Sequence, residues 1–287
     1  MIIYTDLHSR TKNYTLPKTI IKDIESEFDV KITTKIDSNA EIYWGDKLTD
    51  DALLKMPNLK WIHLSKTGIG KFNLPLHIPV TNTPESSNGV AEYALTGVLY
   101  LLRGLDRMEL DRNSFDKNID NIIPFNEVKC LIFGHGRIGK KINKMLSALG
   151  MDVDFITRTK SVNDYSKYNF IINALPLTNE TKDYFDKEFF GKLNKNTYII
   201  NVGRGETINE QHLYEALRKN EIRGAFLDVV KNEPLQKDNK LLTLDNVYIS
   251  PHIANALYNS IDTQVNAFKN NLMLYKRIRP IRNIIKN

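Results

Sequence analysis

Residues 134–139 read Gly-His-Gly-Arg-Ile-Gly, so three glycines stand in the spacing G-x-G-x-x-G. A mostly apolar segment at 128–133 precedes them, and a segment at 140–149 with apolar residues at helical spacing follows. A buried strand, a glycine-rich turn and a helix in this order are typical of an α/β fold in which the helix N-terminus binds the phosphates of a dinucleotide. This feature constrains the fold more than any other in the chain.

The glycines of this turn have separate expected roles. Gly134 permits the tight turn, Gly136 lets the backbone approach the pyrophosphate, and Gly139 allows the helix to pack closely on the strand. The residues expected at the pyrophosphate are Gly134, Gly136, Arg137, Ile138 and Gly139. The alternative is a glycine turn that binds no ligand, which the flanking strand and helix disfavour.

Strand-like and helix-like segments alternate in two series, at 1–82 and 128–249. Such alternation predicts an α/β fold with parallel sheets, and a length of 287 residues suggests about two domains. We predict two Rossmann-like or flavodoxin-like parallel-sheet domains with an interdomain cleft. Residues 1–87 with 259–287 would form the substrate-binding, catalytic domain, and residues 88–258 the NAD(P)-binding Rossmann domain.

The composition indicates where the chain works. Cys130 is its one cysteine, so no intramolecular disulfide can form and a reducing compartment is expected. Asp6 and His8 interrupt the apolar N-terminus too early for a signal peptide, and no stretch reaches the roughly 18 apolar residues of a membrane span. We therefore expect a cytoplasmic protein with no membrane partner.

The net charge of +6 raises the question of a nucleic-acid partner. Part of the excess lies near the C-terminus, in a series that no acid interrupts: Lys269, Lys276, Arg277, Arg279, Arg282 and Lys286. A solvated last helix and tail is the plain interpretation. Neither a zinc-ligand spacing nor a nucleic-acid module is visible, so we expect no metal and no nucleic acid. A basic surface also suits an anionic cofactor and an anionic substrate.

The strand predicted after the glycine turn and its helix, at 153–156, is expected to end near the ribose of the cofactor. An NAD site ends this strand in Asp or Glu, which binds the 2′-hydroxyl. Here Thr157 and Arg158 follow the strand at 153–156, while Asp154 lies within it. An arginine can pair with a 2′-phosphate, so we predict that Thr157 and Arg158 contact the cofactor and that NADP is preferred over NAD. The alternative is that Arg158 and Lys160 are merely exposed loop residues.

Polar side chains stand at the ends of three other predicted strands. Arg204, Asp228 and His252 occupy these ends, and Glu233 follows shortly after Asp228. Because ligands bind beyond the carboxyl ends of parallel strands, we expect the four to converge near the nicotinamide. Alternatively, His252 fills a turn, and Arg204 and Glu233 form structural ion pairs. His8, His63, His77 and His212 have no supporting pattern and are expected to be structural or exposed. His135 stands inside the glycine turn and is expected to point to solvent.

Several ordered strings of the sequence resemble the D-isomer-specific 2-hydroxyacid dehydrogenase family. They are residues 134–139, 175–178, 180–181, 201–205, 227–229, 233–234, 251–252 and, in the helix that would join the domains, 88–93. The resemblance implies an NAD(P)-dependent oxidoreductase that transfers a hydride between the nicotinamide and a small 2-oxo or 2-hydroxy acid.

The resemblance implies three catalytic residues. His252 would protonate the carbonyl oxygen as a general acid. Glu233 would orient the imidazole and favour its charged form. Arg204 would bind the substrate carboxylate through two bonds and polarise the carbonyl.

The resemblance also implies binding roles. Further residues expected at the cofactor are Pro176, Thr181, Val202 and Asp228. Backbone amides near Thr67 and Gly68 would bind the substrate carboxylate together with Arg204. A homodimer formed largely through the dinucleotide domain is implied as well.

The Thr-Arg-Thr at 157–159 resembles the NADPH-dependent glyoxylate/hydroxypyruvate reductases of the family, so we expect a substrate of that type. Pro251 stands where the formate dehydrogenase branch has glutamine, which argues against formate. A dinucleotide-sensing binding or corepressor-like protein of the same fold is the alternative, since such proteins can keep the catalytic residues. Turnover of 2-oxo acids distinguishes the two.

Overall fold

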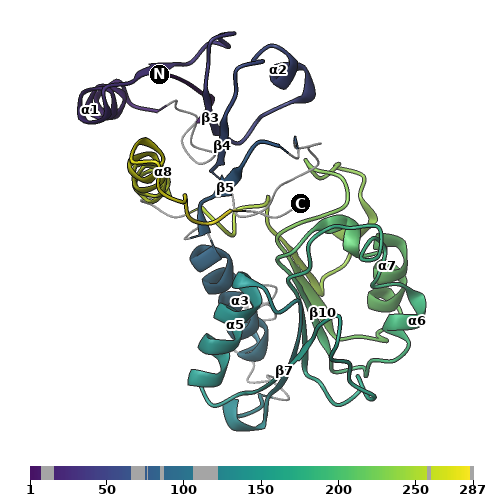
Figure 1. Ribbon diagram of the computed structural model, residues 1–287. Coiled ribbons are helices and arrows are strands. Elements are labelled where there is room, and N and C mark those ends of the chain that lie inside the picture. The colour runs from purple at the N-terminus through teal and green to yellow at the C-terminus, as the bar shows by residue number, and fades with distance from the viewer. Residues whose placement is uncertain are drawn as a thin grey trace. The chain divides into compact units, whose positions relative to one another are not determined.

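The computed structural model of the chain describes residues 1–7, 16–65, 75, 77–84, 87–105, 122–256 and 260–284 (Figure 1). The chain forms two compact units. Unit 1 comprises Met1–Ser86 and Ala256–Asn287, and unit 2 comprises Ser87–Asn255. Within the described residues, none of the helices has both the length and the apolar character needed to cross a membrane.

Unit 1 is built on a parallel five-stranded sheet of order β2-β1-β3-β4-β5. The strands are β1 (Ile2–Thr5), β2 (Lys31–Thr33), β3 (Ile42–Gly45), β4 (Trp61–Leu64) and β5 (Val80–Asn82). The helices are α1 (Lys18–Phe28), α2 (Asp50–Leu54) and α8 (Ser260–Lys276). The central strands β3 and β4 are buried along their whole length, as a parallel sheet covered on both faces requires.

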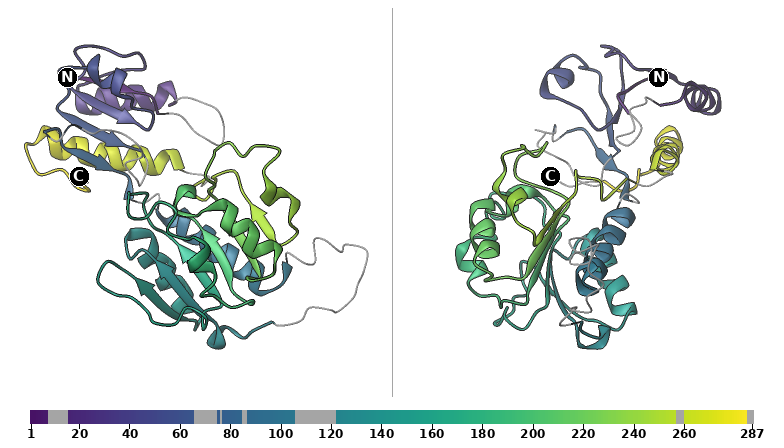
Figure 2. Two further views of the ribbon diagram at one scale, coloured as in Figure 1. Left: turned by 90° about the vertical axis from the view of Figure 1, so that its right-hand side faces the viewer. Right: turned by 180° about the vertical axis from the view of Figure 1, so that it is seen from behind.

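Helix α8 packs against the sheet of unit 1, although it follows unit 2 in the sequence (Figure 2). Phe268 of α8 stacks on Trp44 of β3 with ring centroids 4.1 Å apart, and Trp61 of β4 lies 5.5 Å from the same phenyl ring. All three side chains are fully buried. These large aromatic contacts account for the return of the last helix to the first sheet.

Unit 2 is built on a parallel six-stranded sheet of order β11-β10-β9-β8-β6-β7. Its strands are β6 (Lys129–Phe133), β7 (Asp152–Ile156), β8 (Phe170–Asn173), β9 (Tyr198–Asn201), β10 (Gly224–Leu227) and β11 (Val247–Ile249). Its helices are α3 (Ser87–Leu102), α5 (Arg137–Ala148), α6 (Lys187–Phe190) and α7 (Glu210–Arg218), with short 3-10 turns η2 (Phe125–Glu127), η3 (Gly205–Thr207) and η4 (Lys240–Thr243). The two sheets confirm the predicted fold class of two parallel-sheet α/β domains.

Helices cover both faces of the second sheet (Figure 1). On one face, α3 and α5 bury apolar residues such as Val98 and Ile142 against alternate residues of the central strands. On the other face, α6 and α7 contribute Phe189 and Leu213. This layering leaves the carboxyl ends of the strands as the edge where loops can carry polar side chains.

Candidate functional site

The glycine turn after β6 has the geometry of a phosphate cradle. Gly134 has a φ of +99°, which favours glycine. A Cβ atom on Gly139 would lie 1.9 Å from the Gly134 carbonyl oxygen, so only glycine allows this close approach. A Cβ on Gly136 would meet no atom within 4 Å, and α5 begins at the next residue, Arg137. The open first turn of a twelve-residue helix fits a pyrophosphate.

The acid in β7 is engaged by neighbouring side chains. Asp154 accepts a hydrogen bond from the Tyr168 hydroxyl at 2.8 Å and one from Lys160 Nζ at 3.3 Å. The bond from Tyr168 is the main cause that lowers the pKa of Asp154, and Lys160 adds to it. Asp154 therefore carries a charge that is bound within the chain.

The strand end beyond β7 is a tight turn. Thr157 Oγ1 accepts hydrogen bonds from the backbone N–H groups of Thr159 at 3.2 Å and Lys160 at 3.0 Å. The Thr157 N–H donates to the Lys160 carbonyl at 3.0 Å. Arg158 is exposed at the corner of this turn. The structure thus brings a cation to the position where an NAD site carries an acid.

The loop after β8 lies against the glycine turn, because a Cβ on Gly134 would approach the Ala174 carbonyl oxygen to 2.9 Å. Thr181 Oγ1 donates to the Pro176 carbonyl at 2.6 Å and accepts from the Thr178 N–H at 2.7 Å. Pro176 and Thr181, both expected at the cofactor, are therefore held together in one loop beside the cradle.

Arg204 follows β9 and Val202 in a loop organised by buried amides. Asn173 Nδ2 donates to Asn201 Oδ1 at 2.9 Å, and the same oxygen accepts from the Gly203 N–H at 3.1 Å. Thr207 Oγ1 donates to the Arg204 carbonyl at 2.6 Å. Sequence reasoning did not single out Asn173 or Thr207, although Asn173 closes its strand as Asn201 closes β9.

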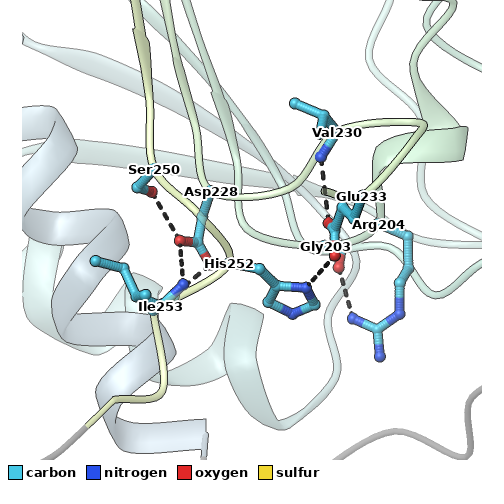
Figure 3. A network of polar contacts seen from close by, with 9 residues as sticks. Gly203, Arg204, Asp228, Val230, Glu233, Ser250, His252 and Ile253 are labelled. Carbon is cyan, nitrogen blue, oxygen red and sulfur yellow. Dashed lines mark hydrogen bonds and ion pairs between the residues drawn. The ribbon is translucent and has the colours of Figure 1, made fainter. Parts of the chain in front are cut away.

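A close contact explains the glycine after Arg204. A Cβ on Gly205 would lie 2.0 Å from the carbonyl carbon of Val230, so the loops after β9 and β10 approach each other at backbone distance. The Arg204 guanidinium donates to the Gly203 carbonyl at 2.6 Å. Figure 3 shows that it extends alongside the His252 imidazole.

His252 and Glu233 form the central pair of the site. His252 Nδ1 lies 2.7 Å from Glu233 Oε2, and Glu233 Oε1 accepts from the Val230 N–H at 3.4 Å (Figure 3). The two side chains are 36% and 39% exposed, so the pair is desolvated in part but accessible. The other ring nitrogen, Nε2, faces away from Glu233. A carboxylate at this distance holds the ring in one orientation.

The backbone of His252 is clamped by Asp228. The buried Asp228 carboxylate accepts from Ser250 Oγ at 2.7 Å and from the N–H groups of Ile253 at 2.8 Å and Ala254 at 3.0 Å. The Asp228 carbonyl accepts from the His252 N–H at 2.9 Å. His252 has a φ of 55°, which non-glycine residues rarely adopt, and strain of this kind is often found at functional sites.

Sequence reasoning expected Asp228 at the nicotinamide and did not identify Ser250. In the structure, both Asp228 carboxylate oxygens accept hydrogen bonds from the segment around His252. The signal for Ser250 was its hydroxyl directly before Pro251 and His252 at a strand end.

Glu210 supports the loop that carries Glu233. Its carboxylate accepts from the Lys231 N–H at 2.5 Å and from Asn239 Nδ2 at 3.2 Å. Glu210 stands in the first turn of α7, where a carboxylate is also favoured by the helix dipole. It was not expected from the sequence, where it reads as an ordinary surface acid.

The structure therefore brings Arg204, Glu233 and His252 together at the carboxyl edge of one sheet. Thr67 and Gly68, expected at the substrate carboxylate, lie outside the described residues. In the described part of the chain, no group of three or more His, Cys, Asp or Glu side chains is arranged to hold a metal ion. A guanidinium beside an imidazole paired to a carboxylate can bind an anion and transfer a proton.

Known proteins are similar to this chain in sequence. The family model described as D-isomer specific 2-hydroxyacid dehydrogenase, NAD binding domain, matches residues 95–254. D-3-phosphoglycerate dehydrogenase of Methanocaldococcus jannaschii is 33% identical over 232 residues, which cover 72% of this chain and 44% of that protein. The probable 2-ketogluconate reductase of Dictyostelium discoideum is 30% identical over 249 residues, which cover 76% of this chain and 72% of that protein.

A solved structure shows the same fold. It is the NADPH-dependent glyoxylate/hydroxypyruvate reductase from Sinorhizobium meliloti, in complex with NADP and sulfate. Its TM-score is 0.83 at 20% sequence identity, and the match covers 99% of this chain and 98% of that chain.

Proposed function

The chain belongs to the D-isomer specific 2-hydroxyacid dehydrogenase family, and from this premise we propose that it reduces a small 2-oxo acid to the D-2-hydroxy acid with His252 as general acid. Enzymes of this family act on CH–OH donors with NAD(P). One observation carries the proposal for His252: its Nδ1 lies 2.7 Å from the Glu233 carboxylate while Nε2 faces away from that partner.

The side chains divide the chemistry among them. A bound reduced nicotinamide supplies the hydride that reaches the carbonyl carbon. His252 Nε2–H donates a proton to the carbonyl oxygen as negative charge develops there. Glu233 holds the ring by its Nδ1–H and stabilises the imidazolium before the transfer. In the reverse reaction, the neutral Nε2 accepts the hydroxyl proton.

Arg204 binds and orients the substrate. Its planar guanidinium offers two parallel donors that match a carboxylate, a geometry that lysine lacks. The buried network of Asn201 and Thr207 holds the Arg204 backbone and so limits the positions of the guanidinium. A 2-oxo acid bound there would present its carbonyl to His252.

Glyoxylate and hydroxypyruvate are the proposed substrates. The names of the two relatives above refer to different compounds, phosphoglycerate and ketogluconate. Both compounds contain a 2-hydroxy or 2-oxo acid group. The Thr-Arg-Thr at 157–159 and the name of the Sinorhizobium meliloti reductase favour the small members of this class.

NADPH is the proposed preferred cofactor. Arg158 occupies the corner of the turn beyond β7, and Asp154 is engaged by Tyr168 and Lys160. A charge-assisted hydrogen bond to the 2′-phosphate contributes about 1.5–3 kcal/mol, which corresponds to about a tenfold to hundredfold preference. We further propose that unit 2 binds the cofactor and that residues near Thr67 and Gly68 of unit 1 contact the substrate. We also propose that two copies of the chain form a homodimer.

A substrate panel tests the proposal. Glyoxylate, hydroxypyruvate, pyruvate and longer 2-oxo acids are mixed with NADPH or NADH, and the loss of reduced-nicotinamide absorbance is followed. We expect turnover of the smallest acids, with a higher kcat/KM for NADPH. Binding of NADPH without turnover of any acid would instead support the dinucleotide-sensing alternative.

A further inference from the structure

His135 lies between two glycines of the turn after β6, and its imidazole stacks on Phe155 of β7. The ring centroids are 4.1 Å apart and the planes meet at 23°, although His135 is an exposed residue. The two strands pair in the register Phe133↔Ile156, so the turn lies beside the carboxyl end of β7. In a Rossmann domain, this is where the ribose of the dinucleotide binds.

Other basic side chains lie at the same strand end. Lys160 Nζ is 5.1 Å from the centroid of the Phe155 ring on which His135 stacks. Arg158 lies two residues before Lys160, in the exposed turn. His135 and Lys160 therefore contact the same aromatic ring from two loops, with Arg158 two residues away in the chain, and basic side chains gathered in this way suit an anion.

The acids nearby are already engaged. Asp154 accepts bonds from Tyr168 and Lys160. The pKa of Glu180 is lowered mainly by a hydrogen bond from Thr178, and Arg158 contributes only as a smaller electrostatic effect. Neither carboxylate is placed as the ribose-binding acid of an NAD site.

We propose that His135 is a specificity-determining residue whose imidazole N–H binds the 2′-phosphate of NADP(H) together with Arg158. The inference rests on the proposed NADPH preference and extends it to a residue outside the strand-end turn. The stack on Phe155 limits the rotation of the ring, so little side-chain entropy is lost when the phosphate binds. NADH lacks this phosphate and gains nothing from the imidazole.

Two variants distinguish hydrogen bonding by the His135 N–H groups from packing of its ring on Phe155. His135→Phe keeps an aromatic ring to pack on Phe155 and removes the N–H groups. Lys144→Gln is the matched control, because it removes an exposed cation from α5, the helix that follows the turn, at a position away from the turn. If His135 only covered Phe155, His135→Phe would bind NADPH and NADH as the wild type does.

The measurement is equilibrium binding without substrate. Reduced-nicotinamide fluorescence gives the Kd for NADPH and NADH, and competition gives the Kd for adenosine 2′,5′-bisphosphate. We expect His135→Phe to weaken NADPH and the bisphosphate about tenfold, and to leave NADH within about twofold. Lys144→Gln should leave all three Kd values within about twofold.

The outcomes distinguish the role of His135 from the proposed cofactor preference. Suppose that the wild type prefers NADPH, and that His135→Phe either keeps this preference or loses affinity for NADPH and NADH equally. The proposed role of His135 is then wrong, while the proposed cofactor preference stands. If wild type binds NADH as tightly as NADPH, the preference and the inference both fail. Because no keto acid is present, none of these results depends on the proposed substrate.

Discussion

His63 lies in the interior of the first sheet, and His252 lies at the carboxyl edge of the second. The two side chains differ in burial and in hydrogen-bond partners. His63 in β4 is fully buried, with Nδ1 2.8 Å from Thr81 Oγ1 and Nε2 3.3 Å from Thr83 Oγ1. Burial lowers the pKa of His63 to about 3. The imidazole therefore stays neutral at ordinary pH and serves as a packed hydrogen-bonding group.

His252 differs in both partner and exposure. It faces a carboxylate rather than hydroxyls, and its side chain is 36% exposed. The carboxylate orients the ring, and access to solvent or substrate allows a proton to be exchanged at the exposed nitrogen. The partner of a histidine and the exposure of its ring together distinguish a proton donor from a structural side chain.

The sharpest test of the comparison removes the imidazole from the exposed site. We expect His252→Ala to lower kcat for 2-oxo acid reduction by about a hundredfold to ten-thousandfold, the range of general acid–base catalysis. Steady-state kinetics with glyoxylate and NADPH measure it. His77→Ala is the control, because His77 is an exposed residue of the other unit. Wild-type turnover in His252→Ala would remove this residue from the mechanism.

The second test changes the partner and keeps the histidine. Glu233→Gln retains a hydrogen-bond acceptor at Nδ1 and loses the negative charge. Because a hydrogen bond to a charged group contributes about 1.5–3 kcal/mol, kcat should fall about tenfold to hundredfold. The Kd for NADPH, measured by fluorescence, should change by less than about twofold. An unchanged kcat would make the pair a structural contact, like that of His63 with Thr81.

The third test loosens the backbone that presents His252. Ser250→Ala removes one of the donors to Asp228 and leaves the two amide donors in place. We expect kcat to fall by about tenfold or less, since one hydrogen bond contributes about 1 kcal/mol. Ser250→Thr restores the hydroxyl and should restore kcat. Equal kinetics in both variants, or a loss confined to the Kd of NADPH, would contradict a positioning role.

These residues also show how far sequence reasoning reaches. The order of strands and helices and the glycine turn could be predicted, because apolar runs and the G-x-G-x-x-G spacing are local features. Arg204, Glu233 and His252 could be grouped because each follows a strand of the same sheet. The resemblance to a family then supplied their expected roles.

What sequence reasoning missed depends on contacts between distant segments. Ser250 meets Asp228 across 22 residues of chain, and Glu210 meets Lys231 across 21. The stack of His135 on Phe155 depends on the register of β6 and β7. Serine and glutamate are common at surfaces, so a single sequence does not distinguish such a partner from an ordinary exposed residue.

The last prediction concerns His63 and the pH dependence of the free energy of unfolding. Because the folded-state pKa of His63 is about 3 and that of an unfolded histidine is about 6.5, the unfolded chain binds more protons between these values. The contribution of neutral His63 is complete above about pH 6.5 and is lost as the pH falls toward about 3. Between about pH 7 and pH 5.5, the free energy of unfolding should fall by about 1.3 kcal/mol from this group.

Tryptophan fluorescence can be used to measure this pH dependence of stability. Both tryptophans, Trp44 and Trp61, belong to unit 1, so tryptophan fluorescence in urea follows the unfolding of the unit that contains His63. His63→Phe removes the titrating group, and any constant loss of stability cancels when only the pH dependence is compared. We expect the wild type to lose about 1.3 kcal/mol more than His63→Phe over this interval. The same pH dependence in both proteins would mean that the buried imidazole is protonated as readily as an exposed one, and the contrast with His252 would then rest on its carboxylate partner alone.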